Sequence, residues 1–505
     1  MACQAGRRLG GALLGSAALL AGCRVGPDFA APPAPEAARL TNAPLPVETV
    51  SAATLGGTPQ RFRTAADLPG TWWEMFHSPQ ISALVAQALR ANPDLRAAQA
   101  TLREARENAS AERGALFPTV SASASAARQQ VSLAAFGLPS GVIPPFDFYS
   151  GALNVSYALD VFGLVRRQIE GLEAQADYER EQLEAAYLTL TANLVGALLT
   201  EAAQKAQIAA AQEIIGLYRQ ELDVVQQRFE LGAVSRAEVL QQQSSLQAAV
   251  ATLPPLQKQL GQQRNLVASL LGVLPSQYVE PTIELTSLHL PADLPVSLPS
   301  QIIAQRPDIR AYAALLHAAT ANVGVATANM LPQFTLTASY GQEGLQVSQL
   351  FTPAAVVWSL GAGLTQPLFE GGMLLHRKRA AVAALEAAAA QYGSVVNTAF
   401  RNVADALVAV TQDAETLRAQ LAAERAAAES LTVTRTQFQA GATTYLNVLQ
   451  AEQSYRSAYL QLVGAQAARF TDTVALFQAL GGGWWHRADV APDVAQCCGV
   501  LPWTR

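Results

Sequence analysis

Two long stretches of the chain carry hydrophobic residues at spacings that alternate between four and three positions. In the first stretch, from about 164 to 230, they are Leu183, Tyr187, Leu190, Leu194, Ala197, Ile208, Ala211, Ile215, Tyr218, Leu222, Val225 and Phe229. In the second they are Val396, Phe400, Val403, Leu407, Val410, Ala414, Leu417 and Leu421. This spacing is typical of a left-handed coiled coil, although Glu201 and Gln204 interrupt it midway along the first stretch. It predicts two long paired helices, the first on the order of 100 Å in length, and a soluble coiled coil would show the same pattern.

A tight turn is predicted where the first long helix ends. Gly232 can close that helix in the left-handed conformation. Ser235, followed three residues later by Glu238, has the pattern of a capping box at the start of the next helix. The chain would therefore return antiparallel to the first helix. Pro254 and Pro255 lie near the middle of the returning segment, where we expect them to interrupt the helix.

The chain contains an internal repeat. Four anchors recur in the same order: 92–96 matches 306–310, 117–118 matches 331–332, 160–163 resembles 367–371, and 228–233 matches 437–442. The offsets are 214 (307 − 93), 214 (332 − 118), 207 (369 − 162) and 209 (441 − 232). Two copies of one structural unit explain this regularity. In the second copy Gly441 and Thr444 take the places of Gly232 and Ser235, and Asn447 stands in place of the glutamate.

Four segments alternate between hydrophobic and small or polar residues, which predicts β-strands. The apolar faces of three of them would carry Tyr149, Leu153, Val155, Tyr157, Leu159 and Val161; Phe334, Leu336, Ala338 and Tyr340; and Val356, Trp358, Leu360, Ala362 and Leu364. A fourth segment, 120–130, is weaker and rich in Ser and Ala. An apolar face opposite a small polar face fits the wall of a membrane barrel, and it fits an ordinary half-buried sheet as well.

The number of strands bears on this choice. Four strands are too few to close a barrel, because about eight is the smallest practical number, and lipid does not tolerate an open sheet edge. Either the sheet is soluble, or several chains pool their strands. The long helices are too extended for a compact globule, and the N-terminus points to a membrane, so we favour pooling.

The N-terminus has the features of a bacterial lipoprotein leader. Two arginines precede an apolar stretch (9–20), and small residues lead into Cys23. We expect residues 1–22 to be a cleaved signal and Cys23 to be acylated; an ordinary signal with a chance cysteine is the alternative. Arg24, in place of an aspartate, favours the outer membrane. No run of about 18 apolar residues follows, so no membrane-spanning helix is expected beyond the leader.

Composition and charge argue against several other classes of protein. Half of the 505 residues are hydrophobic, 14% are charged and the net charge is −5, which suits neither a disordered chain nor a nucleic-acid-binding surface. The five histidines lack the spacing of metal ligands, and no phosphate loop or nucleophile elbow occurs. The four cysteines, including Cys497 and Cys498, follow no zinc or disulfide pattern. We therefore expect no catalytic residue, no metal, no cofactor and no enzymatic activity.

Several motifs together resemble the outer-membrane efflux proteins, the TolC- and OprM-like family, and within it the lipoproteins of NodT type that serve RND pumps. The motifs are 25–28 (VGPD), 72–76 (WWEMF), 92–95 (NPDL), 306–309 (RPDI), 366–372 (QPLFEGG) and 479–484 (ALGGGW). The resemblance covers the chain from Cys23 to about Trp484. It implies an α+β membrane protein with an internal structural duplication. Three chains would form a 12-stranded outer-membrane β-barrel, four strands per chain, continued by a long periplasmic α-helical coiled-coil barrel.

The resemblance also implies a function. A homotrimer would receive drugs or other small molecules from a periplasmic adaptor (membrane fusion) protein and an inner-membrane RND pump. It would conduct them passively through the outer membrane, with energy from the pump. Two alternatives remain: the exit duct of a type I protein-secretion system, and a lipid-tethered periplasmic coiled-coil scaffold.

The candidate site residues also follow from the resemblance, which places the two tight turns at the periplasmic tip. The adaptor-docking residues would be Gly232, Ala233, Val234, Ser235, Gly441, Ala442, Thr443 and Thr444, although these residues would also serve simply to end and cap helices. The periplasmic gate would consist of Leu446, Gln450, Gln453 and Gln241. Family members often carry an aspartate ring where Gln450 stands and a basic residue where Gln453 stands. Because this chain departs at both positions, we expect packing and amide hydrogen bonds to hold the gate; for Leu446 a plain coiled-coil core position is the alternative.

These expectations divide the chain into ten segments. They are a signal peptide (1–22), a lipid-anchored equatorial segment (23–78), first-repeat helices (79–117), a first barrel hairpin (118–162), a first long helical hairpin (163–272), an equatorial linker (273–305), a second-repeat helix (306–331), a second barrel hairpin (332–369), a second long helical hairpin (370–480) and a tail (481–505).

Overall fold

The computed structural model describes residues 24–33, 39–41, 43–64, 66–131, 143–297 and 299–487. The chain divides into two compact units. We call the first, Met1–Pro32, Ala100–Arg180 and Ala311–Gly393, the strand unit, and the second, Pro33–Gln99, Glu181–Arg310 and Ser394–Arg505, the hairpin unit. The expected leader, the lipidation site Cys23 and the C-terminal pair Cys497 and Cys498 lie outside the described residues.

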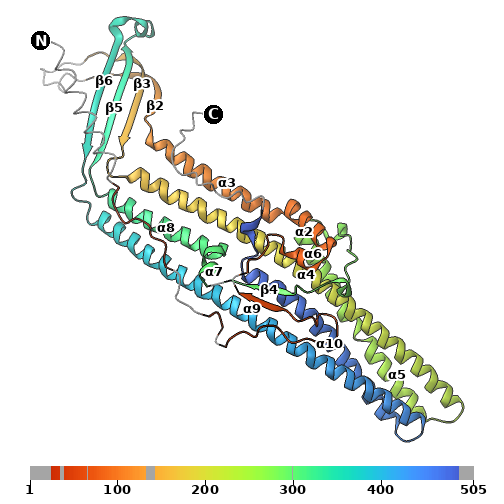
Figure 1. Ribbon diagram of the computed structural model, residues 1–505. Helices are drawn as coiled ribbons and strands as arrows, with labels where there is room; N and C mark the ends of the chain where they lie inside the picture. The colour runs from red at the N-terminus through yellow and green to blue at the C-terminus, as the bar shows by residue number, and fades with distance from the viewer. Residues whose placement is uncertain are drawn as a thin grey trace. The chain divides into compact units, whose positions relative to one another are not determined.

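A four-stranded antiparallel sheet forms the centre of the strand unit. Its strands are β2 (Thr119–Gln129), β3 (Phe146–Leu159), β5 (Gln333–Gly344) and β6 (Val356–Thr365), which are neighbours in the order β2-β3-β5-β6 (Figure 1). All four segments that alternate in the sequence are therefore strands. Because β3 pairs with β5, strands from both copies of the repeat join one sheet.

The same order of elements occurs twice along the chain. Helix α3 (Pro93–Arg113) precedes β2, and α8 (Pro307–Ala328) precedes β5. Helix α4 (Leu164–Glu230) follows β3, and α9 (Met373–Gln439) follows β6; each contains 67 residues and continues from the strand unit into the hairpin unit. Neither long helix contains a proline that would break it. The bounds of α4 agree with those that the hydrophobic periodicity predicts.

The two returning segments differ in continuity. The first consists of α5 (Arg236–Val250) and α6 (Leu253–Leu270), and prolines occupy the first turn of α6. A proline is tolerated in the first turn of a helix but interrupts a helix interior, so the expected break at Pro254 and Pro255 is confirmed. The second returning segment, α10 (Tyr445–Ala479), has no proline and runs unbroken for 35 residues.

Short elements complete the hairpin unit. They are the parallel pair β1 (Arg61–Thr64) and β4 (Asp293–Val296), the helices α2 (Pro79–Ala91) and α7 (Pro299–Gln305), and the 3-10 turn Trp72–Phe76. Trp72 and Phe76 are fully buried and contact Phe477 of α10, with ring centroids 5.6 and 6.4 Å away. The motif at 72–76 therefore forms part of the core of this unit.

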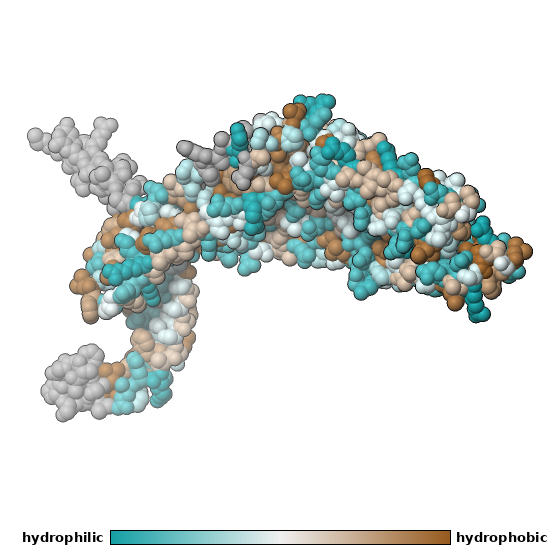
Figure 2. All heavy atoms as spheres, turned by 90° about the horizontal axis from the view of Figure 1, so that it is seen from below, coloured by the Kyte–Doolittle hydropathy of each residue, from teal (hydrophilic) through white to brown (hydrophobic). Residues whose placement is uncertain are grey.

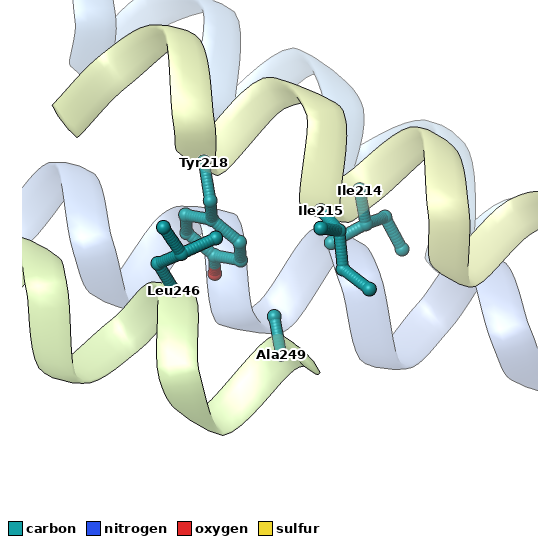
Figure 3. Packing of buried hydrophobic residues seen from close by; sticks show 5 residues of the cluster. All are labelled: Ile214, Ile215, Tyr218, Leu246 and Ala249. Carbon is teal, nitrogen blue, oxygen red and sulfur yellow. The ribbon is translucent and has the colours of Figure 1, made fainter. Parts of the chain in front are cut away.

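The coiled-coil seam is the core of the first hairpin. Ile214, Ile215 and Tyr218 of α4 point toward Leu246 and Ala249 of α5, and all five side chains are buried (Figure 3). The spacing of Ile215 and Tyr218 places them on one face of the helix, as the sequence pattern predicts. Burial of side chains of this size stabilises a hairpin by about 1.5–3 kcal/mol each.

By length and composition, one helix among the described residues, α4, could cross a membrane. Half of its most apolar window is buried inside the protein. The core helix of a soluble protein passes the same test, so this is weak evidence for a membrane span.

Candidate functional site

The four strands align their hydrophobic residues on one face of the sheet. The register places Ala122, Leu153, Tyr340 and Trp358 side by side, and next to them Val120, Val155, Ala338 and Leu360. None of the described residues of the strand unit covers much of this face. Trp358 is 73% exposed and Leu360 is 79% exposed. A broad apolar surface of this kind on a folded chain marks a contact with lipid or with another protein.

The opposite face of the sheet is small and polar. Ser125 and Ser150 lie 2.8 Å apart through their hydroxyl oxygens, and the hydroxyls of Ser339 and Ser359 are 2.9 Å apart. The amide of Asn154 donates a hydrogen bond of 3.1 Å to the hydroxyl of Ser123 on the neighbouring strand. Short hydroxyl side chains leave room for water above the sheet. The sheet therefore has one apolar face and one small polar face.

Both outer strands have an unpaired edge. Among the described strands, β2 pairs only with β3, and β6 pairs only with β5. An edge of unpaired backbone N–H and C=O groups invites pairing with another strand, and in lipid such an edge costs several kcal/mol per unsatisfied group.

The first described residues are held firmly against the strand unit. The guanidinium of Arg167 is fully buried and donates hydrogen bonds to the carbonyl of Val25 (3.1 Å), the carbonyl of Gly26 (3.3 Å) and the carboxylate of Asp28 (2.8 Å). Gly26 has a φ of +91°, and a Cβ there would lie 2.5 Å from the backbone of Gly324. The motif at 25–28 is therefore bound to the first turns of α4.

The first tight turn has the geometry that the sequence predicts. Gly232 has a φ of +73°, and the amide of Ala233 donates to the carbonyl of Arg228 at 2.9 Å, which closes the C-terminus of α4. The hydroxyl of Ser235 accepts a hydrogen bond of 3.3 Å from the amide of Glu238. Ser235 therefore caps α5. A full capping box would also have the Glu238 carboxylate accept a hydrogen bond from the backbone amide of Ser235. The hydrogen bonds of the described residues include only the first of these two bonds.

The second tight turn closes its helix in the same way but caps the next one differently. Gly441 has a φ of +74°, and the amide of Ala442 donates to the carbonyl of Gln437 at 2.8 Å. Thr444 occupies the N-cap position of α10, but its hydroxyl makes no capping hydrogen bond. Instead the side-chain amide of Asn447 donates to the hydroxyl of Thr443 at 2.7 Å. The asparagine that replaces the glutamate therefore pairs with a different residue of the turn.

The docking and gate candidates lie together at one end of the hairpin unit. The turns 232–235 and 441–444 are largely exposed, and Figure 2 shows hydrophobic residues among hydrophilic ones at this end. Leu446 is 55% exposed, and Gln450, Gln453 and Gln241 are exposed as well. Leu446, Gln450 and Gln453 follow one another at spacings of four and three on one face of α10. Leu446 is thus no core residue within a single chain, and any packing role must involve another chain.

A half-buried polar cluster lies directly behind this face, where four helices meet. Arg435 of α9 forms ion pairs with Glu221 of α4 and with Glu452 of α10, the latter at 3.1 Å. Gln242 of α5 is fully buried and donates to the carboxylate of Glu221 at 3.2 Å, and the hydroxyl of Tyr445 donates to the Gln242 amide oxygen at 2.5 Å. We call these five residues the tip cluster. It connects the first hairpin to the second.

Glu452 is the most deeply buried ionisable group of the tip cluster. It is 5% exposed, and its oxygen Oε2 makes no hydrogen bond with the described residues. Burial, reinforced by the carboxyl of Glu221, raises the pKa of Glu452 to about 8. A proton on one of the two carboxyls would let them share a hydrogen bond, which two carboxylates cannot do.

The sequence pattern does not single out the tip cluster. Its members are polar residues within helices whose seams are otherwise apolar, and Tyr445 and Glu452 differ by one heptad on α10. An interruption of the apolar seam is the sequence signal for a buried polar residue, and it identifies Glu201 and Gln204 of α4 but no member of the tip cluster. The pairing of Arg435 with Glu221 spans 214 positions and could not be read from local spacing.

Each hairpin also buries a charged residue farther from the turns. Glu201 of α4 accepts a hydrogen bond from the hydroxyl of Tyr278 at 2.7 Å and pairs with Lys205 at 3.0 Å. Arg469 of α10 donates to the carbonyl of Val410 at 2.8 Å and to the carbonyl of Gly56 at 3.3 Å. Both charges are 1% exposed. Glu201 thus attaches the segment after α6 to the first hairpin, and Arg469 attaches the segment before β1 to the second.

The described residues contain no group of three or more His, Cys, Asp or Glu side chains that could hold a metal ion.

The model of the outer membrane efflux protein family matches residues 84–273 and 298–482. The antibiotic efflux pump outer membrane protein ArpC of Pseudomonas putida is 31% identical over 485 residues, which cover 95% of this chain and 96% of ArpC. SilC of Salmonella typhimurium, described as a probable outer membrane lipoprotein, is 28% identical and covers 82% of this chain and 88% of its own length. Among solved structures, the outer-membrane channel OprN matches with a TM-score of 0.81 and 28% identity, over 92% of this chain and 100% of OprN.

The fold is therefore that of an outer-membrane channel rich in helix. This chain belongs to the outer membrane efflux protein family, which is a family of efflux proteins and not of enzymes.

Proposed function

We propose that this protein is the outer-membrane channel component of a tripartite, RND-type efflux system. It conducts drugs or other small molecules passively from an inner-membrane pump and its periplasmic adaptor to the exterior. Family membership and the similarity to ArpC, named as part of an antibiotic efflux pump, support this function.

The observation that carries the proposal is the sheet of the strand unit. It has an uncovered apolar face, a small polar face and two unpaired edges. If β2 of one copy pairs with β6 of the next, both edges are satisfied and the faces become the outside and the lumen of a barrel. Three copies then form a barrel of 12 strands, comfortably above the practical minimum of about eight. The matching order of elements in the two halves supports an internal duplication.

The mature N-terminus carries a lipid on Cys23 in this proposal. The leader pattern and the similarity to SilC support lipidation. Arg167 of α4 binds Val25 and Asp28, so the described segment that follows the lipidation site is attached to the unit that contains the sheet. In this proposal the lipid anchor and the sheet serve the same membrane.

The tip of the hairpin unit supplies the two remaining activities. The exposed turns Gly232–Ser235 and Gly441–Thr444 are the surface that docks the adaptor protein. The exposed face formed by Leu446, Gln450 and Gln453, with Gln241 beside it, closes the resting channel by packing against the same face of the other two copies. Neutral amides at these positions leave no charged ring to hold cations.

Purification and bilayer recording test the channel. The full-length protein should require detergent for extraction, run as a heat-sensitive trimer and conduct ions weakly in a planar bilayer. A lipid-tethered scaffold would do none of these, and a monomer that stays folded in plain buffer would refute the channel. Export in a deletion strain, measured with a drug panel and with the secreted-protein profile, separates small-molecule efflux from protein secretion.

The double variant Leu446→Ala/Gln450→Ala tests the gate. Removing a hydrophobic side chain and an amide from each copy should open a gap at the tip, so conductance and sensitivity to a bulky antibiotic should both rise. The matched control is Val433→Ala/Gln461→Ala, which truncates one exposed apolar residue and one exposed amide elsewhere on α9 and α10. Unchanged conductance in the gate variant would refute the assignment of these two residues.

A further inference from the structure

The tip cluster places two carboxyl groups, the buried Glu452 and the half-buried Glu221, against a single guanidinium where four helices meet. Glu221 belongs to α4, Arg435 to α9, and Glu452 to α10, while Gln242 of α5 is hydrogen-bonded to Tyr445 of α10. The contacts between Gln242 and Tyr445 and between Glu221 and Arg435 all join the first hairpin to the second. Within the described tip region they are specific polar links between the two hairpins, in addition to apolar packing.

We propose that the tip cluster is a proton-dependent lock, in which one proton shared by Glu221 and Glu452 holds the two hairpins of a chain together beside the gate. This inference rests on the proposed channel function and adds a regulating condition to it, namely the pH of the periplasm.

The charge balance of the cluster explains the need for a proton. The ionisable groups that line the same hollows as Glu452 are, from α4, Tyr218, Glu221 and Arg228; from α9, Arg435; and from α10, Tyr445, Tyr455 and Arg456, while α5 contributes the neutral Gln242. Arg435 is the cation that contacts both carboxyls. With both carboxyls ionised, one buried negative charge has no direct partner, and this costs free energy in a poorly hydrated site. A single proton removes that charge and supplies a donor for the free oxygen of Glu452.

The direction of the pH effect follows from this balance. In the locked state the pKa of Glu452 is raised to about 8, whereas a hydrated glutamate has a pKa of 4.5. The locked state therefore binds the proton more tightly than a state in which the hairpins have separated and water reaches Glu452. By linkage, the lock is firmest at acidic pH, weakens as the pH rises between these two values, and changes no further above the higher one.

The position of the lock connects it to the gate. Tyr445 precedes Leu446 directly, and Glu452 lies between Gln450 and Gln453 on α10. The cluster residues point into the hairpin unit, and the gate residues are exposed. A movement of α10 away from α4 and α5 would therefore displace the gate face at the same time. Loss of the lock should make opening easier without any change in the gate residues themselves.

The unmodified full-length protein in a planar bilayer provides the first test. Open probability should rise with pH from about pH 5 to about pH 8 and then level off, by at most about tenfold per pH unit for one proton. A flat or falling response over this range would overturn the lock. Because this measurement uses no variant, it does not depend on whether a substitution folds.

The variant Glu452→Gln provides the second test, because an amide imitates the protonated carboxyl and cannot lose the proton. Its open probability should stay low across the whole range and change less than about twofold. Two controls make the same carboxyl-to-amide change away from the tip cluster. Glu429→Gln changes an exposed position of α9, and Asp413→Asn changes a second carboxyl pair, formed by Asp413 and Asp472. Both controls should keep the pH response of the unmodified protein. A response that persists in Glu452→Gln, or that disappears in Asp413→Asn instead, would place the titrating group elsewhere and overturn the proposal.

The variant Arg435→Met separates the lock from the channel function. Without the guanidinium the buried carboxyl of Glu452 and the half-buried carboxyl of Glu221 lose their shared cation, so open probability at neutral pH should rise above that of the unmodified protein. If the unmodified protein and all variants conduct but the open probability of none of them changes with pH, the lock is wrong and the channel function stands. If no variant conducts at any pH, the channel function itself has failed.

Discussion

The two long hairpins follow one architectural plan, but they bury charges of opposite sign at the same level. The offset of 209 that relates Gly232 to Gly441 also relates Glu201 of α4 to Val410 of α9. In the first hairpin the carboxylate of Glu201 is surrounded by Tyr278, Lys205 and Arg264. In the second, valine offers no carboxylate, and Arg469 from α10 binds the backbone carbonyl of Val410 instead.

This difference shows how two copies of one unit acquire different attachments. A buried carboxylate needs donors, and the segment after α6 brings Tyr278 to it. A buried guanidinium needs acceptors, and the segment before β1 brings the carbonyl of Gly56 and the hydroxyl of Thr49. Each hairpin is therefore matched to its own connecting segment, because exchange of the two segments would take the Tyr278 hydroxyl away from Glu201 and the Gly56 and Thr49 acceptors away from Arg469.

Replacement of Arg469 should have the largest effect on this comparison. Arg469→Met keeps much of the side-chain volume but removes the donors to the carbonyls of Val410 and Gly56 and to Thr49. Unsatisfied buried acceptors should lower the free energy of unfolding by about 3 kcal/mol. Thermal unfolding of the detergent-solubilised protein, followed by circular dichroism, measures the loss. The control is Arg418→Met on an exposed position of α9. An equal, small effect in both variants would show that the second hairpin is not attached through Arg469.

Replacement of Glu201 should have a smaller effect of the same kind. Glu201→Gln keeps the shape and an acceptor for Tyr278 but removes the charge that pairs with Lys205. Lys205 also contacts Glu280 at 2.8 Å and stays partly compensated, so we expect a loss of about 2 kcal/mol. Glu429→Gln on exposed α9 is the matched control. If Glu201→Gln costs more than Arg469→Met, the ranking of the two anchors is reversed.

The pH dependence of stability should distinguish the second hairpin. Burial and the neighbouring Asp472 raise the pKa of Asp413 to about 7, from an ordinary value of 3.8. The folded protein therefore holds this proton more tightly than the unfolded chain, so stability falls as pH rises between these two values and is constant above. Asp413→Asn should remove the part of the decline that Asp413 causes, leave the part that Glu452 causes, and gain about 1 kcal/mol at pH 8, after allowance for partial solvent exposure. Thermal melts of both proteins at acidic and alkaline pH test it; parallel pH profiles would contradict it.

The caps of the two returning helices should show the smallest difference. Ser235→Ala removes the hydrogen bond to the amide of Glu238 and should cost about 1 kcal/mol locally. Thr444→Ala removes a hydroxyl that makes no such bond and should cost a few tenths of a kcal/mol or less. Hydrogen exchange of the peptides that contain each turn measures both. If Thr444→Ala speeds exchange at its turn more than Ser235→Ala does at the first turn, Thr444 caps α10 after all.

Short-range patterns in the sequence were sufficient to predict most helices, strands and turns of the fold. The range of α4, the four strands, the turns at Gly232 and Gly441 and the break at Pro254 depend on residues that are close in the chain. Helix periodicity, strand alternation, the φ of glycine and the missing N–H of proline act over a few positions. The short pair β1 and β4 was not predicted, because four residues are too few to show alternation.

The sequence by itself thus determined where helices, strands and turns occur, and the residues that resemble a channel family. The tertiary structure alone decided which polar side chains are buried together. Gln242 and Tyr445 are 203 positions apart, and Arg469 and Thr49 are 420 apart. It also decided that Leu446 faces outward while its neighbours Val448 and Leu449 are buried. The physical reason is that burial depends on what the rest of the chain places against a residue, whereas local conformation depends on the residue and its near neighbours.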